Sequence, residues 1–455
     1  MPISPPMRRE AGVMNTKPKI FRTQAEQDLI RQFDQRFLTG NEGLSSLRRD
    51  AFADLREAGL PHRRVEDYRY TDLKAAFATI PDIAARPDLQ AARTALADVG
   101  VWGDLDRHQI VFADGYYFPE LSSADAPGLS VRGLAAALAD GDDVTGRIGQ
   151  LRMQGPDAAL DLNTAFMVDG AMVAITADWV AGKALEFVFL TAGGEETAQY
   201  VRTCIVVEDG ASVQILETHA GPDGLANHSN VVFEASVGDA AHVDWIKVQK
   251  CGDRAMHLGT TLTTMGRQSD FDHFVFTLGS KLSRSQSFLT FAQEGSTANL
   301  RGITLLRGKE HADVTLLVDH AVPACTSQER FKAVIDDQAK GVFQGKIIVR
   351  PLAQKTDGRM MTQTLLLSDD AHVANKPELE IFADDVQCAH GATTGQIDED
   401  LMFYLMARGI PEGEARILLI LAFIGATIEE IGDAAVVERL EAMSRIWLLG
   451  EGADL

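Results

Sequence analysis

The sequence contains few cysteines, and they are widely separated. The four cysteines form no C-x-x-C pair; they are Cys204, Cys251, Cys325 and Cys388. This spacing is typical neither of a disulfide scaffold nor of a self-contained zinc or iron–sulfur site. The sequence therefore predicts reduced thiols in a cytoplasmic protein.

Basic residues are also fewer than acidic residues. The chain of 455 residues has 43 Lys and Arg against 65 Asp and Glu, which gives a formal net charge of −22. A general nucleic-acid binder needs a basic surface that displaces counterions from phosphates, so this class is excluded. The hydrophobic content of 45% is typical of a globular protein and excludes wholesale disorder.

Long apolar runs are missing as well. The longest run, residues 417–428, is about half the length that a membrane-spanning helix needs. Residues 1–20 contain basic side chains but no apolar segment of the kind found in export signals, and we expect a disordered tail there. The sequence predicts no association with a membrane.

Motifs for nucleotide chemistry are incomplete. Residues 341–346 have three residues between their glycines where a P-loop has four, and Ile347 replaces the hydroxyl group that would hold magnesium. The sequence also has no G-x-S-x-G elbow, H-E-x-x-H pair or dinucleotide-binding glycine motif. We expect that this chain binds no nucleotide directly, and that any ATP hydrolysis linked to it occurs on another chain.

The pattern of the chain divides it into three parts after the tail. Residues 21–160 carry mostly helical spacing, with a strand and turn at IVFADGYYF and a short helix at VRGLAAALA. Residues 161–396 form a train of short runs rich in Val, Ile, Thr and Phe, separated by polar turns that recur at roughly 28 to 45 residues. This repetition is typical of a stacked array. We predict a mainly β fold, a right-handed parallel β-helix, with a long β-sandwich as the alternative.

Residues 397–455 are predicted to form a C-terminal helical domain. Asp398 can cap a first helix, Gly409 can end it, and Pro411 can open the next. The second helix is apolar nearly all round over residues 417–428. So wide an apolar surface must pack against neighbouring helices or dock a partner.

The most informative pair of side chains is Cys388 with His390. Residues two apart on an extended strand project from the same face. A thiolate beside an imidazole suits iron, zinc or the edge of an iron–sulfur cluster, but two ligands do not complete a tetrahedral site. The pair is therefore either structural, as a buried thiol beside a hydrogen-bonded histidine, or completed by ligands from another subunit.

Two carboxylate–imidazole pairs allow an enzymatic alternative. His311 with Asp313, and Asp319 with His320, flank one predicted strand and could serve as general acids and bases in a β-helix enzyme that acts on polysaccharide. We interpret the histidines in or beside the other strands as hydrogen-bonded structural groups. A purely structural dimerisation protein is a further alternative.

Residues 365–410, LLLSDDAHVANKPELEIFADDVQCAHGATTGQIDEDLMFYLMARGI, resemble the SufB/SufD family of the Suf iron–sulfur cluster assembly machinery. The segments PHRRVEDYRYTDL, residues 61–73, and LNTAFMVDG, residues 162–170, support the resemblance. B-type members tend to carry E-H-E-A-T-T where this chain has CAHGATT at residues 388–394, which favours the D branch.

The resemblance implies a non-enzymatic scaffold subunit that assists cluster assembly and iron handling. It implies a right-handed parallel β-helix between N-terminal and C-terminal helical domains. The β-helix would pair with a SufB-like paralogue, or with a second copy when isolated, and the C-terminal helices would bind a SufC-like ATPase. His390, with Cys388 as the lesser candidate, would hold transient iron or an iron–sulfur cluster shared with the partner subunit.

Overall fold

The computed structural model describes residues 22–37, 44–123, 125–142, 144, 146–151, 157–179 and 183–450. The predicted tail, residues 1–20, lies outside the described residues. The N-terminal part contains α1 (Gln24–Arg36), α2 (Ser45–Ala58), η1 (Glu66–Tyr68), α3 (Leu73–Ala76), α4 (Leu89–Ala97), β1 (Arg107–Ala113), β2 (Tyr116–Tyr117), η2 (Pro119–Leu121), β3 (Leu129–Gly133), α5 (Leu134–Ala139) and α6 (Ala158–Phe166).

A long series of strands follows without an intervening helix. These strands are β4 (Ala171–Ile175), β5 (Ala184–Leu190), β6 (Ala198–Val207), β7 (Ser212–Ala220), β8 (His228–Val237), β9 (His242–Lys250), β10 (Met256–Met265), β11 (Asp270–Leu278), β12 (Leu282–Phe291), β13 (Thr297–Leu306), β14 (His311–His320), β15 (Thr326–Ile335), β16 (Lys340–Val349), β17 (Asp357–Leu366), β18 (His372–Ile381) and β19 (Gln387–Gly395). The chain then forms α7 (Glu399–Ala407), α8 (Glu412–Glu429) and α9 (Ala434–Leu449).

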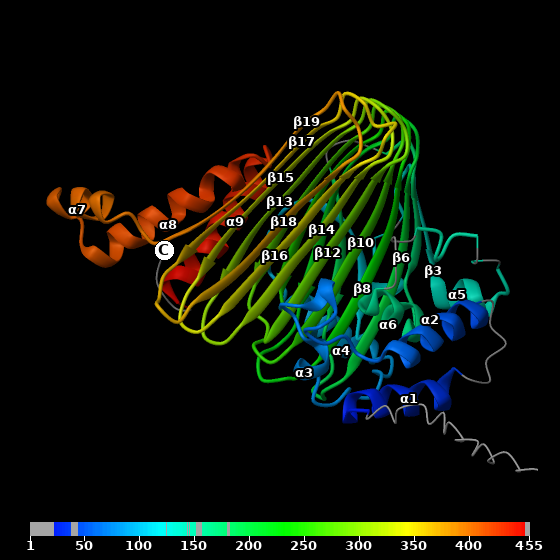
Figure 1. The fold of residues 1–455 in the computed structure, drawn as a ribbon. Helices are drawn as coiled ribbons and strands as arrows, with labels where there is room; N and C mark the ends of the chain where they lie inside the picture. The colour runs from blue at the N-terminus through cyan, green and yellow to red at the C-terminus, as the bar shows by residue number, and fades with distance from the viewer. Residues whose placement is uncertain are drawn as a thin grey trace, which may run out of the picture.

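The strands alternate between two sheets. The 10-stranded sheet has the order β19-β17-β15-β13-β11-β9-β7-β5-β1-β2, and the 9-stranded sheet has the order β18-β16-β14-β12-β10-β8-β6-β4-β3. Each coil of the chain therefore adds one strand to each sheet, parallel to the strand before it, and the coils stack into a β-helix (Figure 1). The prediction of a mainly β, parallel β-helix fold flanked by helices is confirmed.

Short polar turns join the strands and repeat from coil to coil. Gly210 and Gly295 lie in two of these turns and have φ values of 70° and 82°, a region that glycine adopts without strain. Ala240 and Asp337 occupy equivalent turns with φ values of 54° and 51°. The repeated tight turn holds the coils in register.

The space enclosed by the two sheets, called the lumen here, contains the main apolar core. Phe187, Phe233, Trp245 and Phe291 are buried in this core, and Cys388 packs against its end. Because helices and loops cover much of the outer surface, many strands bury both faces, as parallel sheets commonly do.

The two sheets begin within the N-terminal part of the chain. Strand β1 is parallel to β5, and β3 is antiparallel to β4. Helices α1, α2 and α6 pack on the 9-stranded sheet through an aromatic cluster in which the rings of Phe33 and Phe52 stack with centroids 3.8 Å apart. The predicted division of the chain at residue 161 stays a prediction.

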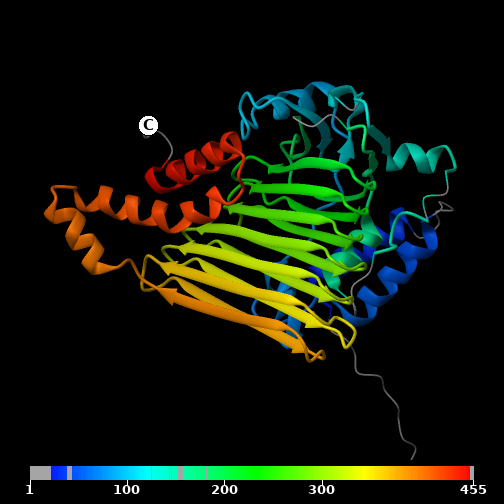
Figure 2. The ribbon, with the colours of Figure 1, turned by 90° about the horizontal axis from the view of Figure 1, so that it is seen from above.

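The C-terminal helices differ in how far they are covered. Ile420, Ile424 and Ile428 of α8 are buried against the outer face of the 10-stranded sheet, beside Phe274 and Phe276. Every residue of α7 is exposed or only partly buried, and Figure 2 shows that this helix extends away from the sheets. Among the described helices, none combines the length and the apolar character needed to cross a membrane.

Candidate functional site

The predicted Cys388–His390 pair lies on β19, the last strand of the 10-stranded sheet (Figure 1). Cys388 is opposite Gly358 and His390 is opposite Met360 on β17. Cys388 packs against the lumenal core, and the alternation of a strand puts His390 on the same face. Cys388 is half-buried and His390 is exposed, so the pair stands at the open end of the lumen.

The chemistry of the pair is that of a partial metal site. Burial raises the pKa of the Cys388 thiol, and the nearby Asp357 and Glu329 carboxyl groups add to this effect. The thiol must therefore lose its proton when it binds a metal ion. Within the described part of the chain, no group of three or more His, Cys, Asp or Glu side chains is placed to hold a metal ion. The soft donors fit iron, but they supply only part of a coordination shell.

Two polar side chains lie below the pair in the lumen: Glu329, which the sequence did not single out, and His320, which the sequence suggested only as half of an acid–base pair. Glu329 on β15 is 0% exposed, and burial raises its pKa to about 8. His320 on β14 is also buried, and its Nε2 lies 3.0 Å from the Ser327 hydroxyl oxygen. The signal in the sequence is weak, because an acidic residue in a strand is usually solvent-facing.

A second polar cluster lies deeper in the lumen. The Lys247 ammonium is 3.1 Å from Glu217, and burial together with Lys247 lowers the pKa of His219 to about 4. Burial also lowers the pKa of His257 and His273. The cluster therefore combines one ion pair with neutral imidazoles. His257 fits the structural interpretation in part, since its Nδ1 lies 2.8 Å from the Ser229 hydroxyl, but its Nε2 has no partner among the described residues.

In the enzymatic alternative, the two carboxyl groups of the carboxylate–imidazole pairs lie far apart, and each is already bound by an arginine. Asp313 is buried in an ion pair with Arg284, and Asp319 accepts hydrogen bonds of 2.8 and 2.6 Å from Arg350. Asp319 lies six positions beyond Asp313 along strand β14, a distance of about 20 Å. A glycosidase places its two carboxyl groups roughly 5 to 9.5 Å apart. The arrangement does not support glycoside hydrolysis.

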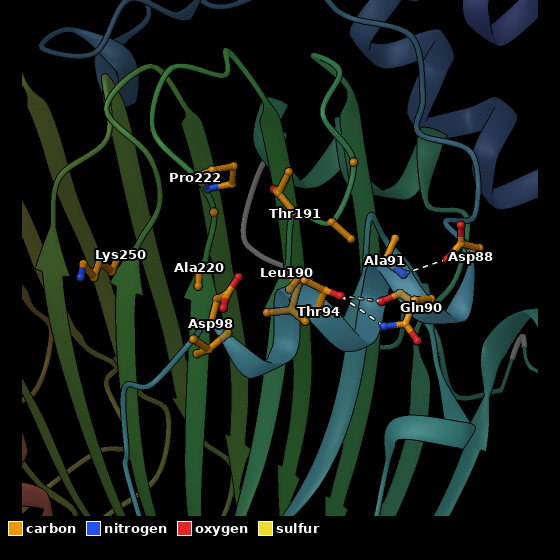
Figure 3. Close-up of a pocket in the computed structure, with 15 residues that line it drawn as sticks. Asp88, Gln90, Ala91, Thr94, Asp98, Leu190, Thr191, Ala220, Pro222 and Lys250 are labelled. Carbon is orange, nitrogen blue, oxygen red and sulfur yellow. Dashed lines mark hydrogen bonds between the residues drawn. The ribbon is translucent and has the colours of Figure 1, made fainter.

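A cavity of 580 Å³ lies between α4 and the ends of β5 and β7 (Figure 3). Asp88, Thr94 and Asp98 line it from the helix side, and Lys250 lines it from the end of β9. In the strand order, β5 and β7 lie toward the opposite end of the sheet from β19. The cavity is thus remote from the Cys388–His390 pair.

The fold and the pair define a class of protein: a β-helix with helical regions before and after it, and a thiol–imidazole pair on its final coil. The family model described as "SUF system FeS cluster assembly, SufBD core domain" matches residues 189–423. The family model described as "SufBD protein N-terminal region" matches residues 23–187. The chain belongs to the SufBD family of iron–sulfur cluster assembly proteins.

Individual relatives agree with this assignment. An iron–sulfur cluster assembly SufBD family protein of Synechocystis is 31% identical over 93% of this chain and 95% of its own length. The iron–sulfur cluster assembly protein SufD of Escherichia coli is 29% identical over 85% of this chain and 89% of its own length. The chloroplastic protein ABCI7 of Arabidopsis thaliana is 30% identical over 52% of this chain and 50% of its own length.

Proposed function

We propose that the chain is a non-catalytic scaffold subunit that assists iron–sulfur cluster assembly and iron handling in the cytoplasm. Cys388 and His390 hold transient iron or a nascent cluster, and a partner subunit supplies the remaining ligands. Iron is cargo in this role. The observation that carries the proposal is the position of a thiol and an imidazole on one face of an end strand, at the mouth of the lumen.

The open end of the β-helix supports pairing with another chain. Strands β18 and β19 are the last strands of their sheets, and an end strand offers backbone groups that a further strand can bond. The partner is a SufB-like paralogue, which brings its own ligands to the same interface. An isolated chain can use these edges to form a homodimer.

The C-terminal helices support docking of a SufC-like ATPase. Phe403 is 74% exposed, and Leu401 and Tyr404 on the same helix α7 are also exposed. An apolar surface of this kind on a short projecting helix favours a protein partner. Nucleotide binding and hydrolysis then occur on the ATPase subunit.

The metal site is tested in the complex formed by co-expression with the paralogue and the ATPase. After anaerobic reconstitution, His390→Ala is expected to reduce the iron content and the cluster absorption severalfold, and Cys388→Ser to reduce them less. His372→Ala is the matched control, because His372 is an exposed histidine on the neighbouring end strand β18. Equal iron loading of the His390→Ala and His372→Ala complexes would contradict the site assignment.

The docking surface is tested separately. Phe403→Asp is expected to abolish co-purification of the ATPase while the paralogue still co-purifies. Leu352→Asp serves as the control, because Leu352 is 76% exposed and lies outside the C-terminal helices. Loss of the ATPase in both variants, or in neither, would refute α7 as the docking element.

Each of the two alternative functions predicts a different experimental result. Turnover of an acidic glycan by the purified chain would establish a polysaccharide-acting enzyme. Unchanged activity of cellular iron–sulfur enzymes after deletion of the chain would favour a purely structural dimerisation protein. The proposed scaffold predicts no glycan turnover and a loss of iron–sulfur enzyme activity.

A further inference from the structure

Glu329 has a buried carboxyl group that forms no ion pair with any described residue. Its side chain is 0% exposed, and neither of its carboxyl oxygens forms an ion pair or a hydrogen bond of good geometry in the part of the chain that the structure describes. The Ser327 hydroxyl and the backbone N–H of Glu329 offset only part of the rise in its pKa that burial causes. Burying a polar group without a hydrogen bond destabilises a fold. Two other buried glutamates are paired: Glu234 lies 2.7 Å from Arg202, and Glu217 lies 3.1 Å from Lys247. Glu329 differs from both.

The register of the 10-stranded sheet places Glu329 below the Cys388–His390 pair. Glu329 is opposite Met360 on β17, and Met360 is opposite His390 on β19. Neighbouring strands lie about 4.8 Å apart, so the Cα atom of Glu329 is about 10 Å from that of His390. Since every second residue of a strand shares a face, Glu329 and the pair point into the same lumen.

The column next to Glu329 carries no side chain on β17. Ser327 is opposite Gly358, and Gly358 is opposite Cys388. A Cβ atom added at Gly358 would be in ordinary contact, at 3.6 Å, with Ile347 of β16 and with the Ser327 hydroxyl. The Met360 side chain lies against Gly345 on β16. The layer between the thiol and the carboxyl group therefore holds the side chains of Ile347 and Met360, which must move aside when Glu329 turns toward the ion.

We propose that Glu329 is a further cation-binding residue of this site, which supplies a carboxylate oxygen from inside the lumen to the ion held by Cys388 and His390. This inference rests on the proposed function of that pair. Thiolate, imidazole and carboxylate together suit a divalent transition-metal ion such as Fe²⁺ or Co²⁺. When the ion binds, the thiol and the carboxyl group each release one proton to solvent, and no electron is transferred.

The side chain must turn to reach the ion. As the described side chains stand, no three donors lie at ligand spacing. Rotation about the torsions of Glu329 toward Gly358 shortens the gap, and no described residue forms an ion pair that holds the carboxyl group in its present position. The raised pKa of the group is consistent with a carboxyl that stays neutral until a cation approaches.

The test is anaerobic titration of Co²⁺ into the co-expressed complex, followed by the thiolate-to-cobalt absorption band. The wild-type complex is expected to develop the band. Glu329→Gln should keep the band but weaken Co²⁺ binding at least tenfold. Thr362→Val, a matched change of another buried polar residue on the lumenal face of β17, should bind as the wild type does.

The outcomes separate this inference from the function on which it rests. If Cys388→Ser and His390→Ala abolish binding but Glu329→Gln binds within twofold of the wild type, Glu329 is not part of the site. If all of these variants bind alike, both the inference and the proposed site fail.

A second measurement separates binding from folding. Glu329→Gln and Glu329→Leu are expected to melt at or above the wild-type temperature, because each removes an unpartnered buried acid. Lower melting temperatures for both variants would show that the carboxyl group is structural and would overturn the proposal.

Discussion

At the scale of single residues, the buried charges of this protein fall into two kinds. Arg202 with Glu234, and Arg284 with Asp313, are compensated pairs in which each charge lies against its opposite. Glu329 has no such partner among the described residues. A compensated pair holds two segments together, whereas an uncompensated acid lowers stability and responds to pH.

The stability of the fold should therefore depend on pH through Glu329. Its pKa is raised from 4.5 to about 8 by burial. Between these values the unfolded chain ionises this group and the folded chain does not, so the unfolded state is favoured as the pH rises. Relative to Glu329→Gln, the wild type should lose about 1.4 kcal/mol of unfolding free energy per pH unit across most of this window.

Urea unfolding of both proteins between pH 5 and pH 8 measures this difference. His320, whose pKa burial lowers to about 4, is present in both proteins and cancels in the comparison. Parallel pH profiles for the two proteins would mean that Glu329 is already ionised in the folded chain.

At the scale of elements, the C-terminal helices have two kinds of apolar side chain: some pack against the sheet and others are exposed. The sequence left both outcomes open for residues 417–428. Ile420, Ile424 and Ile428 pack on the 10-stranded sheet, while Phe403 on α7 stays exposed. Helices α7 and α8 are joined by a short connection, residues 408–411, so one C-terminal segment both packs on the sheet and presents an exposed apolar surface.

Substitutions in the two groups should have opposite consequences. Ile424 is 1% exposed, and Ile424→Ala should lower the unfolding free energy by about 2–4 kcal/mol, because it leaves a cavity. Phe403→Ser should leave the unfolding free energy unchanged within about 0.5 kcal/mol. Denaturant titration of the isolated chain checks both values. Comparable destabilisation by the two changes would mean that α7 is packed in solution.

Most helices and strands could be predicted from local sequence patterns, but which face of each strand points into the lumen could not. Runs such as LEFVFLTA and YVRTCIVV are rich in β-branched and aromatic residues and form β5 and β6. Because these strands are buried on both sides, they lack the alternation that reveals which side chains enter the lumen. The role proposed for Glu329 depends on Cys388, which lies two coils later in the same sheet, and no local pattern in the sequence connects these two positions.

At the scale of the whole molecule, the β-helix has two unlike ends. At one end, β3 runs antiparallel to β4 and N-terminal helices lie nearby; at the other, β18 and β19 conclude the two sheets (Figure 2). Exposed apolar side chains accompany the second end: Ile381 is 42% and Phe382 is 62% exposed. This asymmetry favours association through the end that carries the Cys388–His390 pair.

A charge on that end should block association without unfolding the chain. Ile381→Lys is expected to weaken binding of the paralogue, or of a second copy, at least tenfold, because charged edge residues oppose strand pairing. Light scattering gives the oligomeric state and thermal melting reports the fold. Val206→Lys, at a position that is 42% exposed on an inner strand, is the control that should leave association intact. Association unchanged by Ile381→Lys would place the interface elsewhere.

Because each coil of a β-helix contacts only its neighbours, the coils differ in how many neighbours stabilise them. An inner strand such as β17 bonds β15 on one side and β19 on the other, whereas β19 bonds only β17 within the described sheet. The final coil thus has a neighbour on only one side, so its amide hydrogens should exchange first, and the proposed metal-binding residues lie where the solenoid most readily opens.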